Sequence, residues 1–130
     1  MQTTQLVGIW KLESNAGKPP ADYGVKTALI QFKADGTFID VTESLSPVPG
    51  LVPERIYRLK GAWKLDENVL ERTLKGYWQN RKRVWPEGNF AEGTSPTITR
   101  EAVIAIDDDT LEFAAGQDYG IFLYKRVNTS

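Results

Sequence analysis

Tight turns alternate with long loops along this chain, and the alternation constrains its fold more than any other feature. Turn-forming sequences at residues 33–37, 66–68 and 107–109 separate runs in which apolar and polar residues alternate. Longer connections lie between these turns, at residues 15–24, 45–54 and 79–96. Successive connections of an up-and-down antiparallel sheet lie at alternate ends of the sheet. We therefore expect one end to be closed by tight turns and the other to be ringed by long loops.

The runs between these connections predict an all-β domain. They are rich in β-branched and aromatic residues and alternate with a period of two. We expect strands at residues 5–14, 25–33, 37–44, 55–65, 69–78, 97–106, 110–114 and 119–127. Eight strands are enough for a closed barrel that holds one small ligand. The prediction is one domain over residues 1–130, an eight-stranded antiparallel up-and-down barrel, with an extra hairpin or a lid in the loop at 79–96.

Composition excludes several classes of function. The chain has no cysteine and no histidine, which removes disulfides, thiolate nucleophiles and the commonest metal ligand and general base. We therefore expect no metal and no cofactor. The net charge is −1, so nucleic acid is not an expected partner. The sequence shows no signal peptide and no apolar run long enough to cross a membrane, which predicts a cytoplasmic protein.

Two arginines lie in runs whose alternation places them among apolar residues. Arg72 alternates with Leu70 and Leu74, and Arg100 shares its phase with Ile98, Ala102, Ile104 and Ile106. A charge inside a barrel is costly unless it is paired or solvated. One interpretation is that a guanidinium holds an anionic or carbonyl group of a ligand. The alternatives are an internal salt bridge with Asp40 or Glu13, or a face assignment that is wrong by one residue.

Six aromatic residues lie at strand ends or in the long loops. Small-molecule sites are mainly apolar with a few placed polar groups, so aromatic residues near the open end are candidate ligand contacts. Ordinary packing is the alternative for each of them. The candidate ligand-binding residues are Tyr23, Tyr57, Arg72, Trp78, Trp85, Phe90, Arg100 and Tyr119.

Several short motifs resemble those of the lipocalin-like (calycin-type) barrels. Gly8-Ile9-Trp10 resembles the Gly-x-Trp signature near the lipocalin N-terminus, and Arg126 stands near the end of the last predicted strand. The segments at 32–38 and 61–66 resemble bacterial lipocalin-like domains. The resemblance implies a lipocalin-like barrel in which Arg126 packs across Trp10 at the closed end. It also implies a small-molecule site, and some barrels of this group are cyclases or isomerases.

Three hypotheses of function follow. The leading one is binding of a small, largely apolar or amphipathic molecule, with or without one anionic or carbonyl group, by a monomer or homodimer. The second is a cofactor-independent cyclase or isomerase, with Tyr57, Arg100, Tyr119 and Glu54 as candidate catalytic residues. The third is an interaction module whose barrel is filled by side chains. A perturbed carboxylate or tyrosine that faces the interior would favour the enzyme.

Overall fold

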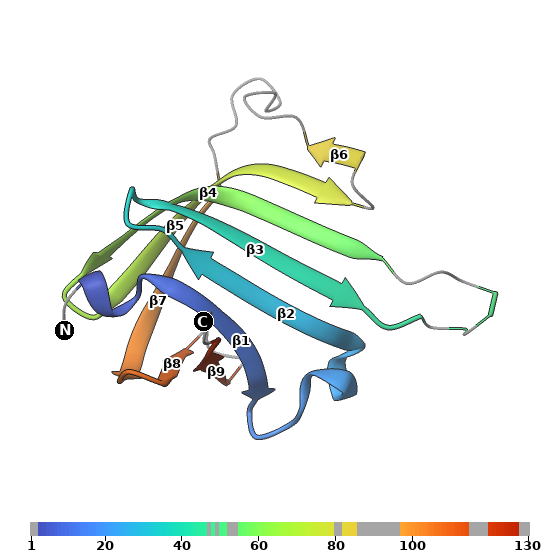
Figure 1. Ribbon diagram of the computed structural model, residues 1–130, viewed down its shortest axis with the longest axis horizontal. Helices are drawn as coiled ribbons and strands as arrows, with labels where there is room; N and C mark the ends of the chain where they lie inside the picture. The colour runs from blue at the N-terminus through green and yellow to red at the C-terminus, as the bar shows by residue number, and fades with distance from the viewer. Residues whose placement is uncertain are drawn as a thin grey trace.

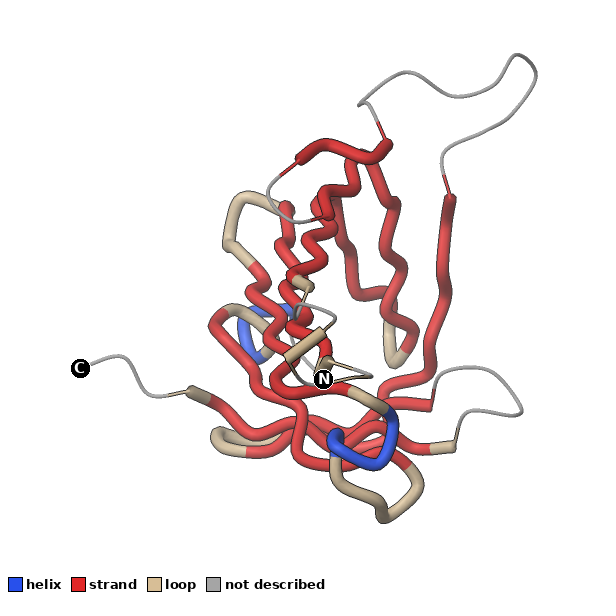
Figure 2. The backbone as a smooth tube through the Cα atoms, turned by 90° about the vertical axis from the view of Figure 1, so that its right-hand side faces the viewer, coloured by secondary structure: helices blue, strands red, loops and turns tan. Residues whose placement is uncertain are grey.

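The computed structural model describes residues 3–46, 48, 50–51, 55–79, 82–85, 97–114 and 120–127. Within these residues the chain forms antiparallel strands and two short 3-10 helices, η1 (Thr3–Gln5) and η2 (Pro20–Tyr23). The strands are β1 (Gly8–Asn15), β2 (Val25–Phe32), β3 (Thr37–Ser44), β4 (Ile56–Asp66), β5 (Val69–Gln79), β6 (Lys82–Trp85), β7 (Thr97–Ile106), β8 (Thr110–Ala114) and β9 (Ile121–Arg126). Figure 2 shows that strands make up most of the described backbone.

Eight of these strands close into a barrel. The order of hydrogen-bonded neighbours is β4-β3-β2-β1-β9-β8-β7-β5-β6, and an additional β4–β5 pairing joins the first strand of this series to β5 (Figure 1). Strand β6 pairs only with the last residues of β5, beyond the part of β5 that pairs with β7. The predicted eight-stranded antiparallel barrel is thus confirmed, and β6 is an extra strand within the loop at 79–96.

The apolar core fills the half of the barrel next to the tight turns. Trp63 connects this core to the turn between β2 and β3, because its indole nitrogen donates a hydrogen bond of 3.0 Å to the carbonyl of Lys33. The ring of Phe32 meets the Trp63 ring edge-on at 5.3 Å between centroids. The largest fully buried side chains are Trp10, Phe32, Phe38, Phe113, Leu6, Ile30, Leu70 and Leu111. This end of the barrel is therefore packed with side chains.

Arg126 closes this end of the barrel. Its guanidinium carbon lies 4.2 Å from the centroid of the Trp10 ring, which is the contact that the lipocalin-like resemblance implied. The guanidinium also donates hydrogen bonds to three backbone carbonyls, those of Gln5, Val7 and Asp108. These carbonyls belong to the N-terminal segment and to the turn after β7. One side chain thus ties the start of the chain to the last strand and to a neighbouring turn.

Gly8 makes room for this arrangement. Its φ of +140° is one that residues with a side chain rarely adopt, and a Cβ there would overlap the Nη1 atom of Arg126. The two-residue spacing between Gly8 and Trp10 therefore has a physical basis: the guanidinium lies over the indole in space that the glycine leaves free.

None of the described helices has the length and apolar character needed to cross a membrane.

Candidate functional site

Three charged side chains face the barrel interior about halfway along the strands. Asp40 is on β3, Arg72 on β5 and Glu101 on β7, and we call these three residues the interior polar cluster. Each is paired in the strand register with a buried core residue: Asp40 with Ile30, Arg72 with Trp63, and Glu101 with Leu70. Directly paired residues on neighbouring strands share a face of the sheet, so all three charges lie on the inward face.

Arg72 is held by both carboxylates and by two aromatic rings. Its Nη2 atom donates a short hydrogen bond to Oε1 of Glu101, and its Nη1 atom lies 3.7 Å from Oδ2 of Asp40. The guanidinium carbon is 5.6 Å from the centroid of the Phe38 ring and 6.0 Å from that of Phe113. Cation–π contacts of this kind add to the ion pairs. The expected guanidinium fork is therefore already occupied by groups of the protein.

Hydrogen-bonding capacity remains unfilled in the cluster. The Oε2 atom of Glu101 and the Nε atom of Arg72 are buried and have no hydrogen-bond partner among the described residues. The hydroxyls of Thr42 and Thr99 donate long bonds of 3.4 Å to the carboxylates of Asp40 and Glu101, respectively. Buried polar atoms are nearly always hydrogen-bonded in folded proteins, so an unpartnered carboxylate oxygen marks a position where a donor would be stabilising.

Burial perturbs the titration of the groups around the cluster. Loss of hydration raises the pKa of Asp40, and this effect outweighs the opposing attraction of Arg72. The nearby charge of Glu101 raises the pKa of Asp40 further. Burial, together with the charge of Asp40, also raises the pKa of the Tyr124 hydroxyl. Two carboxylates thus share one guanidinium, and Asp40 holds a proton more tightly than an exposed aspartate does.

An aromatic wall lies beside the interior polar cluster. The rings of Phe113 and Tyr124 are stacked, with centroids 5.2 Å apart and an interplanar angle of 16°. Phe122 packs against both, at 5.7 Å from Phe113 and 6.5 Å from Tyr124. Because Phe113 also contacts Arg72, the wall and the cluster are adjacent. Phe113 and Tyr124 are buried in the core and Phe122 is half-buried, so the aromatic wall joins the core to the interior polar cluster.

Exposure of the interior increases away from the closed end. Ile30 and Phe38 are almost completely buried, whereas the side chains of Asp40 and Arg72 keep 17% and 13% of their exposed area. The inward residue Thr42 and its partner Tyr57 on β4 are half-buried. Solvent therefore reaches the cluster from the side of the long loops, although the opposite side of the interior is dry.

Arg100 corrects the sequence-based face assignment. Its side chain is 64% exposed and lies 3.2 Å from the carboxylate of Glu71 on the outer wall of the barrel. Glu101, which the alternation had placed outside, is buried, as is Val103 on the same face of this strand. The reason is a register shift between Val103 and Ala105. Ile106 packs against the core and faces inward. Because of the shift, Arg100 does not share the face of Ile106, although the two are an even number of positions apart.

The other predicted site residues fall into three groups. Arg72 faces inward as predicted and pairs with Asp40, one of the alternatives weighed above, and Tyr57 lies on the inward face opposite Thr42. Only the backbone positions of Tyr23, Trp78 and Trp85 are described, in η2, β5 and β6. Glu54, Phe90 and Tyr119 lie outside the described residues. A register shift between Lys60 and Gly61 also interrupts the alternation of β5 after Leu74.

The sequence analysis did not identify the aromatic wall. Phe113 follows Leu111 by two residues, and Phe122 precedes Tyr124 by two, so both pairs have the spacing of a shared face. The sequence therefore carries this signal, but the predicted ligand contacts were aromatic residues at strand ends and in the long loops. The partnership between Arg72 and Glu101 joins residues 29 positions apart, and only the pairing of β5 with β7 reveals it.

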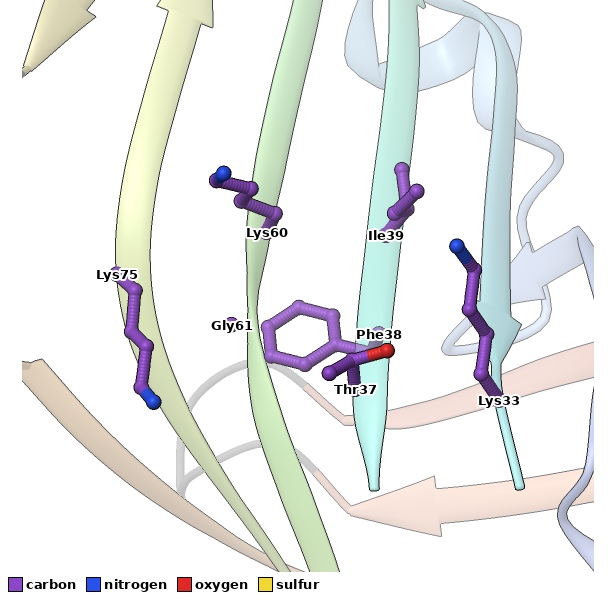
Figure 3. Close-up of a pocket in the computed structure, with 7 residues that line it drawn as sticks. All are labelled: Lys33, Thr37, Phe38, Ile39, Lys60, Gly61 and Lys75. Carbon is purple, nitrogen blue, oxygen red and sulfur yellow. The ribbon is translucent and has the colours of Figure 1, made fainter. Parts of the chain in front are cut away.

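A separate depression of about 290 Å³ lies on the outer wall (Figure 3). It is lined by Lys33, Thr37, Phe38, Ile39, Lys60, Gly61 and Lys75. A Cβ at Gly61 would overlap the carbonyl of Thr73, so the wall has no side chain at this point. In Figure 3 the ammonium ends of the three lysines lie on different sides of the depression and do not converge. The depression therefore lacks the convergent polar groups of the interior.

Comparison with protein families and with curated proteins adds no relative. No protein-family model matches the chain, and no curated protein is significantly similar to it in sequence. Among the described residues, no group of three or more histidine, cysteine, aspartate or glutamate side chains is placed to hold a metal ion. The closed antiparallel barrel of eight strands is consistent with a calycin-like fold.

Replacing Arg72 by methionine should destabilise the protein much more than the same change at Arg100. Arg72→Met leaves two buried carboxylates without a cation, which costs about 3–5 kcal/mol in comparable buried pairs. Arg100→Met removes only an exposed ion pair, worth about 0–1 kcal/mol. Urea denaturation of both variants and the natural protein measures the difference. Equal losses of unfolding free energy would contradict the assignment of Arg72 to the interior.

Asp40→Asn should stabilise the protein at pH 7. Because the pKa of Asp40 is higher in the folded than in the unfolded protein, its ionised form destabilises the fold. This destabilisation is absent below the unfolded-state pKa and develops as pH rises through the folded-state pKa. The gain from Asp40→Asn should therefore shrink as pH falls from 8 toward 4, measured by denaturation at each pH.

Asp35→Asn is the control of opposite sign. Hydrogen bonds from the hydroxyl and backbone N–H of Thr37 lower the pKa of this exposed carboxylate, so its substitution should destabilise the protein at neutral pH. That loss should also shrink as pH falls. A gain for Asp40→Asn that instead grows toward low pH would rule out this account of the cluster.

Proposed function

We propose that the protein binds a small, largely apolar molecule in the half of the barrel nearest the long loops, as a member of the lipocalin-like group of barrels would. The observation that carries the proposal is the partly exposed interior polar cluster beside the aromatic wall. The apolar body of a ligand would lie against Phe122, the half-buried member of the aromatic wall. Burial of such surface stabilises a complex by about 25 cal/mol per Å². The cluster would fix the orientation of a polar group.

The energetics of buried charge support this proposal. Replacing a buried group of ions by apolar side chains of similar size is often neutral or stabilising, by about 1–4 kcal/mol. A barrel that only needed a packed core would therefore be served better by apolar residues at positions 40, 72 and 101. Charges halfway along the interior, where solvent still reaches Asp40 and Arg72, are more useful for recognition than for stability.

Filling the interior from β7 should abolish binding. Thr99 is paired with Arg72 in the strand register and faces inward, whereas the next residue, Arg100, faces out. We expect Thr99→Trp to weaken the binding of the neutral apolar dye N-phenyl-1-naphthylamine by about tenfold or more, because the indole occupies the ligand volume. Arg100→Trp is the matched control and should bind like the natural protein. Fluorescence titration measures both constants.

Two results would contradict the proposal. If the natural protein does not bind the dye, the interior is filled and the chain is better interpreted as an interaction module. If Thr99→Trp and Arg100→Trp weaken binding equally, the dye does not occupy the barrel interior.

A second candidate function is catalysis of a cyclisation or isomerisation in the same interior. The observation that favours it is Asp40, an inward-facing carboxylate whose pKa is raised by burial. A carboxyl group that keeps its proton closer to neutral pH can protonate a reacting oxygen or alkene, and such catalysis is typically worth about 10²–10⁴-fold. Arg100, on the outer wall, is not available for this role, and Asp40 replaces it among the candidates.

Asp40→Asn separates the two functions. Native mass spectrometry of the protein from its natural source, followed by denaturation, would identify a molecule that copurifies. Incubated with this molecule, Asp40→Asn should bind it but convert it at least about 100-fold more slowly if Asp40 is the proton donor. Glu71→Gln, on the outer wall, is the control. Unchanged conversion by Asp40→Asn would exclude this mechanism, and no conversion by either protein would leave binding as the function.

A further inference from the structure

The balance of charge in the interior indicates the chemical class of the ligand. Asp40 and Glu101 carry two negative charges against the single positive charge of Arg72 when all three are ionised. The other inward-facing cation among the described residues, Arg126, lies at the closed end, where backbone carbonyls and Trp10 hold it. The interior polar cluster is therefore one positive charge short of neutrality.

The remaining hydrogen-bonding capacity has the same bias. Arg72 uses its Nη2 atom on Glu101, turns its Nη1 atom toward Asp40 and packs against two rings. Its unpartnered Nε atom is buried. On the acceptor side, Oε2 of Glu101 is unpartnered and equally buried, and Oδ2 of Asp40 is 3.7 Å from Arg72, beyond an ordinary hydrogen bond. Asp40 is the most exposed of the three side chains, so its Oδ2 atom is the acceptor that the cluster offers to an incoming group.

We propose that the interior site selects a molecule in which a protonated amine is attached to an apolar, preferably aromatic, body, and that it disfavours carboxylates. This inference rests on the proposed binding function and specifies its ligand class. The ammonium group would lie against Asp40 and bring the cluster to neutrality, while the apolar body lies against Phe122 of the aromatic wall. It replaces the sequence-based expectation of an anionic group held by a free arginine.

A proton on Asp40 reduces the negative charge of the cluster, as an amine would. The pKa of Asp40 is raised mainly by its burial and further by the charge of Glu101, and a nearby ammonium group would oppose both effects. The charged groups around Asp40 are Arg72 and Glu101, and Tyr124 is the neighbouring titratable hydroxyl. Binding of an amine should therefore compete with protonation of Asp40, so amine affinity should rise with pH, whereas the affinity for a neutral ligand should not.

Three probes of equal length test the selection: 4-phenylbutylamine, 4-phenylbutanol and 4-phenylbutyrate. Each competes with N-phenyl-1-naphthylamine at pH 7 and moderate salt. We expect the amine to bind at least about tenfold more tightly than the carboxylate, because the two head groups meet an excess negative charge with opposite sign. A ratio near one, or a tighter carboxylate, overturns the inference.

Charge-neutralising variants locate the source of the preference. Glu101→Gln should reduce the ratio of amine to carboxylate affinity to below about threefold, because one carboxylate then balances the guanidinium of Arg72 and no excess negative charge remains. Glu71→Gln, which removes a charge from the outer face of β5, should leave the ratio unchanged. If Glu101→Gln does not fold, Asp40→Asn supplies the same readout. A preference that survives in the interior variants overturns the inference.

The natural protein alone provides an independent readout. Lowering the pH from 8 to 5 should weaken the binding of 4-phenylbutylamine and leave 4-phenylbutanol unaffected. Aliphatic amines titrate near pH 10, so the probe stays protonated throughout this range. If the dye binds inside the barrel but no head group is preferred, the binding function stands and the ligand class is wrong. If neither the dye nor any probe binds, both proposals fail.

Discussion

The contact between Arg126 and Trp10 is the constraint on which the closed end of this barrel depends. A guanidinium above an indole contributes about 0.5–2 kcal/mol, more when water is excluded. Here the same group also donates to carbonyls of the N-terminal segment and of the turn after β7. The first strand is thereby fixed to the last, which the closed barrel requires. Gly8 is needed because a side chain at that position would displace the guanidinium.

A dry, closed end determines what the rest of the interior can do. Trp10 and Leu111 are fully buried near the closed end, where an unpaired charge would be costly. Nearer the long loops, the inward positions are half-buried, and there the chain places Asp40, Arg72 and Glu101. Buried ions by themselves are weak evidence for a role in stability. The position of these charges, between the packed core and the more exposed interior, therefore makes the cluster a candidate for ligand recognition.

The sequence predicted the wall of the barrel better than the chemistry inside it. Strand β3 and strands β7 and β8 have the predicted bounds, because turn residues and alternation are local signals. Arg72 was placed on the correct face for the same reason. Arg100 was not, because the register shift near Ala105 changes the phase of β7, and bulges of this kind have no clear sequence signature. Phe113 and Tyr124 lie within strands, whereas the predicted aromatic contacts lay at strand ends and in loops.

By itself, the sequence determined a closed antiparallel barrel with one sealed end. Apolar and polar residues alternate within each strand, and turn-forming residues mark each tight turn. The motif residues Gly8, Trp10 and Arg126 lie near the two ends of the chain. Only the tertiary structure decided which charges meet. The hydrogen bond between Arg72 and Glu101 depends on the pairing of β5 with β7, and Asp40 joins them across the interior from β3. Long-range pairing and local register shifts, to which a short sequence window is insensitive, decide the charge of the interior.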